Sequence, residues 1–526
     1  MSRIVLTKVY NRTEFYGCVH PLGIMYLASF LRDRRPGKDD LRLHDMILGR
    51  EPAEVAIPKI LDFAPDIVGL SCMTHEASVA HELAKQIKVR APFTKVIVGG
   101  PYTGGNPEKI LQNPAIDYVV VGEGEWTFLE LVEALERGET NPSIPGVAYM
   151  RRNEYVWNCG RDPAEGEMLD SIPFPAWDLV DIEAYYDKPR FASGYAVREY
   201  MSMFTSRGCP YHCTYCHEVF GKKFHAHSME RTMAELDAIV ERYGVGELCI
   251  VDDIFNIDRK RALAISEAIA SRGYDLKIDF PNGIRADQMT YELLEAMKRA
   301  GTYRLSLAVE TATPRLQKFT KKHVNLTKMN EVIGWCDGLD IFSHGFLMLG
   351  FPGETREEIE TTIDYALKSR LHTANFFAVN PFEGTEMSRQ VAEMGIEVND
   401  GATDNFNYFK NNFQLSEVGT ADLADVIKDA NRRFYMNARR ITRIIQVMPY
   451  KMELPRFFVL FVIRSLPIFK SHKDGQAWLD FTTAVHTAVN RARARLFPSR
   501  HVARRKALAK RLREEREQAA PAAPIG

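Results

Sequence analysis

The chain has 526 residues, of which 45% are hydrophobic and 26% charged, and its formal net charge is -1 at pH 7. This composition predicts a globular protein of two or three domains, because a single hydrophobic core rarely grows beyond about 250–300 residues. The near-zero net charge excludes a general electrostatic attraction to nucleic acid, so no nucleic-acid partner is expected.

Five of the eight cysteines are isolated in the sequence: Cys18, Cys72, Cys159, Cys249 and Cys336. They form no visible disulfide framework, which is typical of a protein in a reducing cytoplasm. The first six residues read directly as a strand and lack the regions of a signal peptide. We therefore predict a cytoplasmic protein.

Residues 1–140 alternate short apolar runs with helical stretches, a pattern that predicts a parallel sheet with helices on both faces. The expected strands are residues 4–6, 41–44, 67–71, 96–98 and 118–121. Five such strands suggest a flavodoxin-like, doubly wound (Rossmann-type) α/β domain. Ligands of these folds bind beyond the carboxyl ends of the strands.

Glycine-rich segments follow the last two of these strands. They are Gly99, Gly100 and Pro101 after the fourth strand, and Gly122, Glu123, Gly124 and Glu125 after the fifth. Glycine lets backbone approach a ligand closely and permits positive φ. Tight strand-to-helix turns need glycine as well, so the residues alone leave both interpretations open.

Residues 141–195 are rich in turn residues and read as a linker with a few strands. Trp157 and Trp177 are expected to pack between the domains that the linker joins. From residue 196 to 415 a second β/α series predicts a barrel of parallel strands. Its expected strands are residues 201–205, 248–251, 277–280, 304–309, 342–349 and 374–379, with helices near 230–243, 259–272, 290–300, 325–337 and 355–369.

Three cysteines stand at C-x3-C-x2-C spacing just after the first barrel strand: Cys209, Cys213 and Cys216. Iron–sulfur clusters are usually held by four thiolates, so three suit a four-iron cluster with one iron left open. The alternative is a structural zinc site that uses the three thiolates with His217, His225 or His227.

The loop resembles the signature of the radical S-adenosylmethionine (radical SAM) enzymes, including an aromatic residue, Tyr215, before the last cysteine. In that family the cysteines hold a 4Fe–4S cluster whose open iron chelates S-adenosylmethionine (AdoMet), and the strands form a partial (β/α)6 barrel. The resemblance implies AdoMet contacts at strand ends: Asp252 and Asp253 to the amine, Glu310 to the ribose, and Gly350 to the adenine.

The N-terminal region resembles the cobalamin-binding domain of one radical SAM subgroup, through Pro21-Leu22-Gly23, the glycines after Val98 and those after Val121. The subgroup includes class B radical SAM methyltransferases and the anaerobic magnesium-protoporphyrin IX monomethyl ester cyclase. The Asp-x-His-x-x-Gly motif of some cobalamin domains is missing, since His44 precedes Asp45. We therefore expect cobalamin without a histidine on its lower face, and neither His44 nor His75 as a ligand.

The resemblance implies an oxidoreductive enzyme that cleaves AdoMet to a 5′-deoxyadenosyl radical, using electrons from a donor such as flavodoxin or ferredoxin. The expected reaction is C-methylation of an unactivated carbon in a small hydrophobic or natural-product substrate. The alternative is oxidative cyclisation, ring contraction or rearrangement of a tetrapyrrole, lipid or hopanoid without methyl transfer. A more remote alternative is methylthio transfer, with Cys18, Cys72 and Cys159 holding a second cluster.

Residues 416–526 form an expected helical region with a basic tail. An apolar run, 457–463, ends at Arg464 and is far shorter than the roughly 20 residues of a bilayer span. It predicts a core helix or an interfacial segment. Residues 491–516 hold eleven Lys and Arg against two Glu, so peripheral contact with the inner membrane is a further hypothesis. Substrate specificity is expected around the aromatic segment 405–413.

Overall fold

The computed structural model describes residues 1–451, apart from 12–16, 189, 191–194, 217–219 and 397–412, and a few positions beyond 451. Most of the apolar run 457–463, of the basic segment 491–516 and of the aromatic segment 405–413 thus lies outside the described residues. Within the described part of the chain, no helix is both long enough and apolar enough to cross a bilayer.

The N-terminal domain contains a seven-stranded sheet in the order β2-β1-β3-β4-β5-β6-β7. Its parallel strands confirm the five predicted ones: β1 (Ser2–Lys8), β2 (Asp39–Asp45), β3 (Ile67–Ser71), β4 (Lys95–Gly99) and β5 (Tyr118–Val120). An antiparallel hairpin, β6 (Val147–Arg151) and β7 (Glu154–Trp157), extends the sheet. The sheet therefore continues into the segment expected to be a linker.

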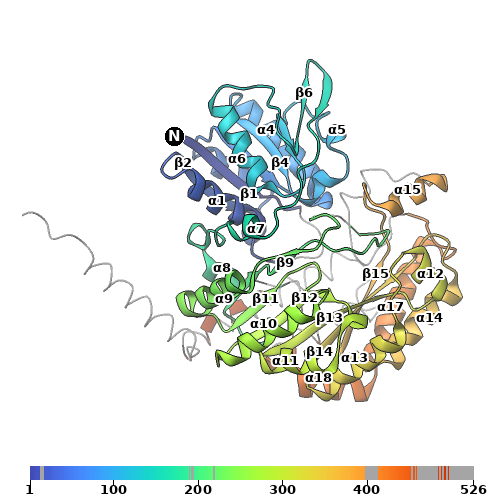
Figure 1. The fold of residues 1–526 in the computed structure, drawn as a ribbon. Coiled ribbons are helices and arrows are strands. Elements are labelled where there is room, and N and C mark those ends of the chain that lie inside the picture. Colours follow the sequence, from blue (N-terminus) through green and yellow to red (C-terminus); the bar gives the residue numbers. More distant parts are fainter. Residues whose placement is uncertain are drawn as a thin grey trace, which may run out of the picture.

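Helices cover both faces of this sheet (Figure 1). One face packs against α1 (Leu22–Arg34) and α6 (Gly124–Glu136), and the other against α3 (Ala53–Leu61) and α4 (Ala77–Arg90). Side chains of β1 alternate between the two layers, because successive residues of a strand point to opposite faces. The short helices of this domain are α2 (Met46–Gly49), η1 (Thr74–Glu76), η2 (Pro101–Gly104) and α5 (Pro107–Ile110).

The second sheet has six parallel strands in the order β15-β14-β13-β12-β11-β8, each next to its neighbour in the chain. They are β8 (Tyr200–Met203), β11 (Glu247–Ile250), β12 (Lys277–Ile284), β13 (Thr302–Glu310), β14 (Phe342–Leu349) and β15 (Thr373–Ala378). This sequential order confirms the predicted partial (β/α)6 barrel. Antiparallel β9 (Ser206–Arg207) and β10 (His225–Ala226) form a small separate sheet.

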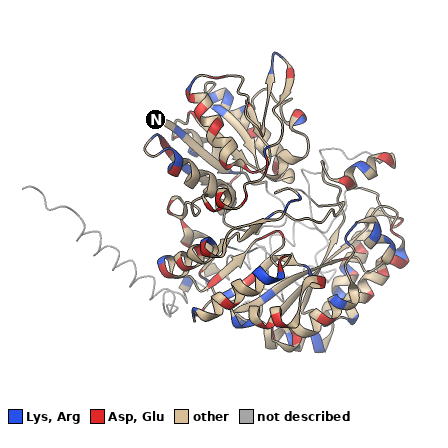
Figure 2. Cartoon of the chain, in the orientation of Figure 1, with Lys and Arg blue, Asp and Glu red and all other residues tan. Residues whose placement is uncertain are grey.

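The barrel helices lie outside the strands, as Figure 1 shows. They are α9 (Met229–Tyr243), α10 (Arg259–Ser271), α11 (Tyr291–Arg299), α13 (Leu326–Gly338) and α14 (Arg356–Lys368), with short η4 (Ala286–Gln288), α12 (Pro314–Phe319) and α15 (Glu386–Glu393). Helix α14 begins with a capping box, in which Thr355 and Glu358 each bond the other's backbone N–H. Figure 2 shows basic and acidic residues mixed over these outer helices.

Both edges of the barrel sheet are covered. Helix α17 (Thr420–Tyr435) lies along β15, and the Tyr435 hydroxyl bonds the N–H and the carbonyl of Ala374 at 3.1 and 2.9 Å. Helix α18 (Ala438–Val447) follows it. At the other edge, the Tyr200 hydroxyl of β8 donates to the Cys18 carbonyl of the N-terminal domain. Such contacts protect edge strands from unwanted pairing.

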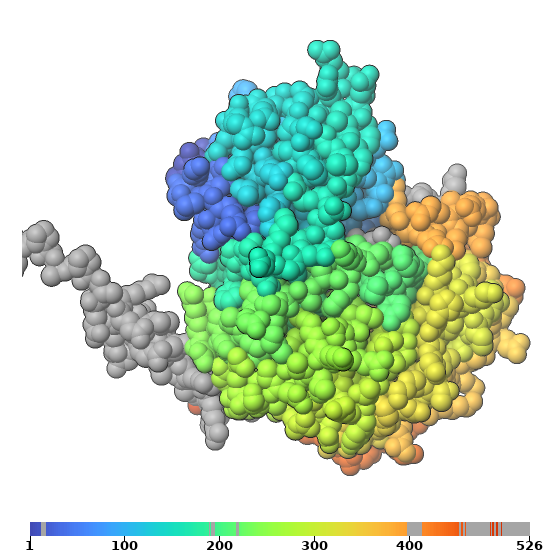
Figure 3. Space-filling view, viewed as in Figure 1, coloured from blue at the N-terminus to red at the C-terminus, as the bar shows by residue number. Residues whose placement is uncertain are grey.

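The two domains pack closely against each other (Figure 3). Met25 and Tyr26 of α1 share one apolar cluster with Trp177 of the linker and Leu236 of α9. Trp177 is thus buried between the domains, as expected. Trp157 is not, and the expectation for it was wrong: it lies on the outer edge strand β7 with 39% of its surface exposed. The linker also holds α7 (Glu167–Asp170), η3 (Trp177–Leu179) and α8 (Ile182–Tyr186).

Candidate active site

The three cysteines lie in a loop at the carboxyl end of β8, closed at its base by the β9–β10 pair. Cys209 and Cys213 are half-buried and Cys216 is exposed, so all three thiols are accessible. The loop is fixed by its backbone, because Gly208 has φ +78° and a Cβ there would lie 2.1 Å from the Lys223 carbonyl. Its entry is therefore closely constrained.

The zinc alternative loses one of its three candidate histidines, His225, whose two ring nitrogens are both engaged. His225 Nε2 lies 2.7 Å from a Glu123 carboxylate oxygen, and its Nδ1 lies 2.9 Å from the Lys223 carbonyl oxygen. His227 contacts Asp170 through Nδ1 at 3.1 Å, and its Nε2 has no hydrogen-bond partner among the described residues. The third candidate, His217, lies outside the described residues. Among the described residues, no three His, Cys, Asp or Glu side chains are gathered closely enough to hold a single metal ion.

The two adjacent acids after β11 have different surroundings. Asp252 is buried and accepts hydrogen bonds from the Thr205 N–H (2.6 Å), the Thr205 hydroxyl (2.5 Å) and the Ser206 hydroxyl (2.6 Å). These bonds fix the chain that leads into the cysteine loop. Asp253 accepts one bond, 3.0 Å long, from the Gly208 N–H. Burial raises the pKa of both carboxyls.

Glu310 ends β13 with an unusual backbone φ of +63° and is 7% exposed. Its carboxylate lies 3.3 Å from the ammonium of Lys322. Burial by itself would lower the pKa of Lys322, but the charge of Glu310 keeps that pKa above its ordinary value. A buried, paired acid at this strand end is suited to bonding hydroxyl groups of a ligand.

The turn after β14 is also stabilised by hydrogen bonds within the protein. Gly350 has φ +90°, and Glu354 Oε2 accepts from the N–H groups of Gly350 (2.6 Å) and Phe351 (2.9 Å). The ring of Tyr215, in the cysteine loop, lies 6.3 Å from that of Phe351. The structure thereby brings the cysteine loop and the Gly350 turn together, as sequence analysis expected for groups at the same end of parallel strands.

The glycines of the N-terminal domain have different surroundings, so glycine is required at some of these positions by the fold and at others leaves open space. At Gly100 (φ +87°) an added Cβ would lie 2.9 Å from the Cys72 carbonyl, so the fold itself demands glycine. Gly124 lies against Leu27, and the Cβ of a residue at Gly99 would lie 3.9 Å from the Val120 carbonyl. Gly122 has φ +84° and open space where its side chain would stand. Of these glycines, Gly122 therefore offers the clearest room for a bound group.

The predicted cobalamin-rim acids face the barrel. Arg207 of β9 contacts Glu123 through Nη1 and Glu125 through Nη2, both at 2.7 Å. On the opposite side of the interface, Lys109 pairs with Glu383 at 3.3 Å. Sequence analysis missed Arg207. The signal that could have found it is its charge, because this arginine close to the cysteines is opposite in charge to the acids of the glycine-rich segment 122–125.

The two domains present the carboxyl ends of their strands to each other. Residues after β4 and β5 of the N-terminal sheet contact residues after β15 and β8 of the barrel. Both ends are where ligands bind in these folds. The arrangement leaves the cysteine loop between the two sheets.

That neither His44 nor His75 of the N-terminal domain is a cobalt ligand stays a prediction. His44 Nε2 lies 3.0 Å from Glu51, and burial lowers the pKa of both His44 and His75. Cys18 and Cys72 are buried in the apolar core of this domain, whereas Cys159 is exposed. The structure therefore does not assemble these cysteines into the second cluster site that methylthio transfer would use.

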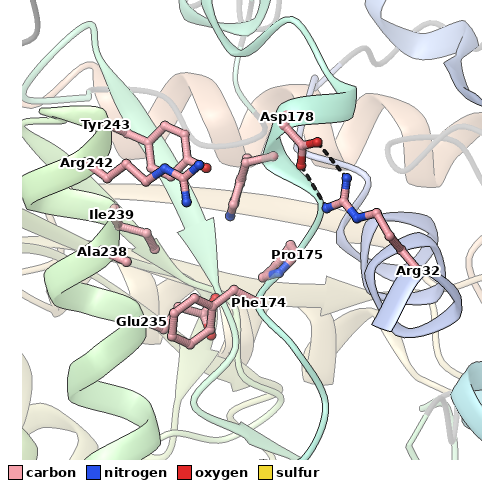
Figure 4. A pocket seen from close by; sticks show the side chains of 10 residues that line it. Arg32, Phe174, Pro175, Asp178, Glu235, Ala238, Ile239, Arg242 and Tyr243 are labelled. Atoms are coloured by element: carbon pink, nitrogen blue, oxygen red, sulfur yellow. Dashed lines mark hydrogen bonds and ion pairs between the residues drawn. The ribbon is translucent and has the colours of Figure 1, made fainter. Parts of the chain in front are cut away.

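A cavity of about 330 Å³ lies outside this region, between α1, the linker and α9 (Figure 4). It is bordered by an ion pair in which both Nη atoms of Arg32 contact Asp178, at 2.6 and 2.9 Å. Its lining includes Phe174, Trp177 and Tyr243 but no residue of the cysteine loop. This cavity is thus separate from the candidate active site.

Comparison with known proteins identifies both domains. A B12 binding domain model matches residues 9–132, and a Radical SAM superfamily model matches residues 203–366. An uncharacterized methyltransferase of Pyrococcus horikoshii is 34% identical over 70% of this chain and 77% of its own length. The chain belongs to the cobalamin-binding radical SAM enzymes. Its cofactors are accordingly cobalamin, AdoMet and a 4Fe–4S cluster.

Other relatives of this radical SAM enzyme carry different activities. Cytidylyl-2-hydroxyethylphosphonate methyltransferase of Streptomyces wedmorensis is 29% identical over 73% of this chain and 80% of its own. Anaerobic magnesium-protoporphyrin IX monomethyl ester cyclase of Cereibacter sphaeroides is 26% identical over 80% of this chain and 68% of its own length. The radical SAM methyltransferase TsrM of Kitasatospora setae, solved with cobalamin and a 4Fe–4S cluster bound, shares the fold with a TM-score of 0.65. The two chains are 18% identical, and the match covers 82% of this chain and 92% of TsrM.

Proposed function

We propose that this enzyme C-methylates an unactivated carbon of a small hydrophobic or natural-product substrate. The observation that carries the proposal is the facing arrangement of the two sheets, with the cysteine loop between them. A substrate held there would be reached from both cofactor domains. The methyltransferase names of two relatives support the same reaction.

The described residues suit distinct roles around the bound cofactors. When bound, the cluster and AdoMet supply a 5′-deoxyadenosyl radical and cobalamin supplies a methyl group. Cys209, Cys213 and Cys216 hold the cluster in this proposal. Asp253 takes the AdoMet amine in preference to Asp252, whose oxygens are already bonded by the protein.

The remaining AdoMet contacts follow from the strand ends. Glu310, buried beside Lys322, bonds the ribose hydroxyls. The Gly350 turn lies along the adenine, and Glu354 keeps its shape by accepting two backbone bonds. The N-terminal domain holds cobalamin beside Gly122, where the backbone borders open space.

The second candidate function is ring formation or another oxidation without methyl transfer. The observation in its favour is the cyclase of Cereibacter sphaeroides, which aligns with 80% of this chain. Both reactions would start from the same radical and differ only in the fate of the substrate carbon. The described residues serve either one.

Isotope-labelled AdoMet distinguishes the two functions. The enzyme, purified anaerobically with cobalamin and reduced by flavodoxin or ferredoxin, would be given AdoMet with a deuterated methyl group and candidate lipids, tetrapyrroles, polyketides and peptides. We expect a product that carries the labelled methyl group, together with 5′-deoxyadenosine. A product that has lost hydrogen and gained no label would overturn methylation and support the cyclase-like reaction.

A further inference from the structure

One buried guanidinium joins the loops of the two cofactor domains. Arg207 is 2% exposed, and its two terminal nitrogens contact two different carboxylates, of Glu123 and Glu125, at 2.7 Å each. Both carboxylates are nearly as buried as the arginine, with side-chain exposures of 8% and 6%. The planar guanidinium holds the two carboxylates in one fixed geometry on its two terminal nitrogens, whereas the three rotatable donors of a lysine ammonium fix no such geometry.

The surroundings of Arg207 leave it little freedom. His225, its partner on the adjacent strand β10, also contacts Glu123, at 2.7 Å. The rings of Tyr26 and Phe220 lie 5.5 and 5.2 Å from the guanidinium. A buried pair with several partners holds one geometry, whereas exposed pairs of the same residues are loose.

The residues on each side of this contact are next to the cofactor loops. Arg207 stands two positions before Cys209 and is separated from it only by Gly208. Glu123 and Glu125 flank Gly124 and follow Gly122. Because Arg207 and its two partners adjoin these loops, a change at the guanidinium would directly shift the cysteine loop relative to the glycine-rich loop 122–125.

Another contact between these domains has a different character. Gly105 and Gly384 meet backbone to backbone, since a Cβ at Gly384 would lie 2.5 Å from the Gly105 Cα. This close approach can act as a pivot, because it contains no long side chain that could bend. Together with the apolar cluster around Trp177, the Arg207 contact would then set the angle between the domains.

We propose that Arg207 is a positioning residue that sets the distance between the iron–sulfur cluster and the corrin by clamping Glu123 and Glu125. The inference rests on the proposed function, which puts cobalamin beside Gly122. It predicts that loosening the clamp changes the spacing of the cofactors while each cofactor stays bound in its own domain.

The spacing can be measured in the holoenzyme without a substrate. Cob(II)alamin and the reduced cluster each carry an unpaired electron, so pulsed electron paramagnetic resonance reports the distance between them. We expect a single narrow distance in the wild type, and a longer, broader distribution in Arg207→Lys and Glu125→Gln at unchanged iron and corrin content. Glu125→Gln keeps the side-chain size and the Glu123–His225 contact, so it is informative even if the arginine variant does not fold.

Arg32→Lys is the matched control. It weakens a two-pronged arginine–aspartate pair that is exposed at the edge of the cavity in Figure 4, and it should leave the distance unchanged. A wild-type distribution in both test variants would overturn the inference, as would loss of iron or corrin in both, which would show that Arg207 only holds the fold. A wild-type enzyme that binds no corrin would instead overturn the proposed function, and the inference with it.

Discussion

At the scale of single residues, the cysteines of this chain divide by exposure. Cys209, Cys213 and Cys216 are accessible in one loop, whereas Cys249 and Cys336 are buried. Cys336 is fully buried in the apolar core of the barrel, where it packs as an apolar side chain. Accessibility is what cluster assembly needs, because iron has to reach the sulfurs.

Replacing Cys213 with alanine should abolish the cluster. A cluster with only three protein ligands cannot lose one and keep its site, so we expect loss of most bound iron and of the thiolate-to-iron absorption. Iron analysis and the visible spectrum after anaerobic reconstitution measure this. The control Cys159→Ala, exposed but outside the loop, should retain both signals. Stoichiometric zinc without iron in the wild type would contradict the assignment.

Glu354 combines full burial with a shifted pKa. Burial raises the pKa of this carboxyl from near 4.5 to about 7, even though two backbone N–H groups favour the charged form. The folded state therefore binds the proton more tightly than the unfolded chain does. The stability that this group contributes is present below about pH 4.5 and is lost as the pH rises to about 7.

Glu354→Gln should remove this pH dependence. Between pH 5 and 7 the wild type should lose about 1.4 kcal/mol of unfolding free energy per pH unit relative to the variant, because one proton is released. Denaturant midpoints of the two proteins at several pH values measure the difference. Glu358→Gln, whose carboxyl pKa is lowered mainly by Arg315, should not reproduce it. Parallel pH curves for wild type and Glu354→Gln would contradict the prediction.

At the scale of elements, the open barrel depends on how its edge strands are covered. Strand β15 has no further strand beside it, and α17 takes that place. The Tyr435 hydroxyl satisfies both the donor and the acceptor of Ala374, which would otherwise be buried without partners. Helix α17 thus supplies hydrogen-bond partners to the backbone of the edge strand, as a neighbouring strand does elsewhere in the sheet.

Tyr435→Phe should destabilise the barrel without disturbing its chemistry. The change leaves two backbone groups of Ala374 unsatisfied, at a cost of about 1–3 kcal/mol in unfolding free energy. Denaturant unfolding measures the loss, and iron content should stay at the wild-type level. Tyr291→Phe, at an exposed position of α11, provides the comparison and should change stability little. Equal stability of all three proteins would contradict this role of α17.

At the scale of the whole molecule, two ligand-binding sheets face each other, and the C-terminal region adds a basic segment. That segment, residues 491–516, lies largely outside the described residues, so its charge is known only from the sequence. We propose that it brings the enzyme to an anionic membrane surface, where a hydrophobic substrate would be at hand. Cations near such a surface gain about 1 kcal/mol each.

The full-length enzyme should therefore sediment with anionic vesicles at low salt. Binding should weaken as ionic strength rises, because salt screens the attraction. It should also fall sharply when residues 491–526 are deleted, and vesicles of neutral lipid serve as the control. Sedimentation that is absent at low salt, or unaffected by the deletion, would show that this segment does not act at a membrane.

The sequence by itself determined the local features of this enzyme. Periodicity located both sets of parallel strands, and the spacing of Cys209, Cys213 and Cys216 indicated the cluster loop. These signals are visible because each depends on residues close together in the chain. Resemblance then connected the two domains to cobalamin and AdoMet, which the comparisons confirmed.

Only the tertiary structure decided which residues far apart in the sequence contact one another. The sequence predicted Glu123 and Glu125 at the cobalamin rim, but the structure turns both toward Arg207 across the domain interface. Likewise Asp252 bonds the chain before the cysteine loop, and Trp157 lies exposed on an edge strand. A carboxylate or an indole has the same local pattern in either role. Its partner is set by the packing of segments far apart in sequence, which no local pattern contains.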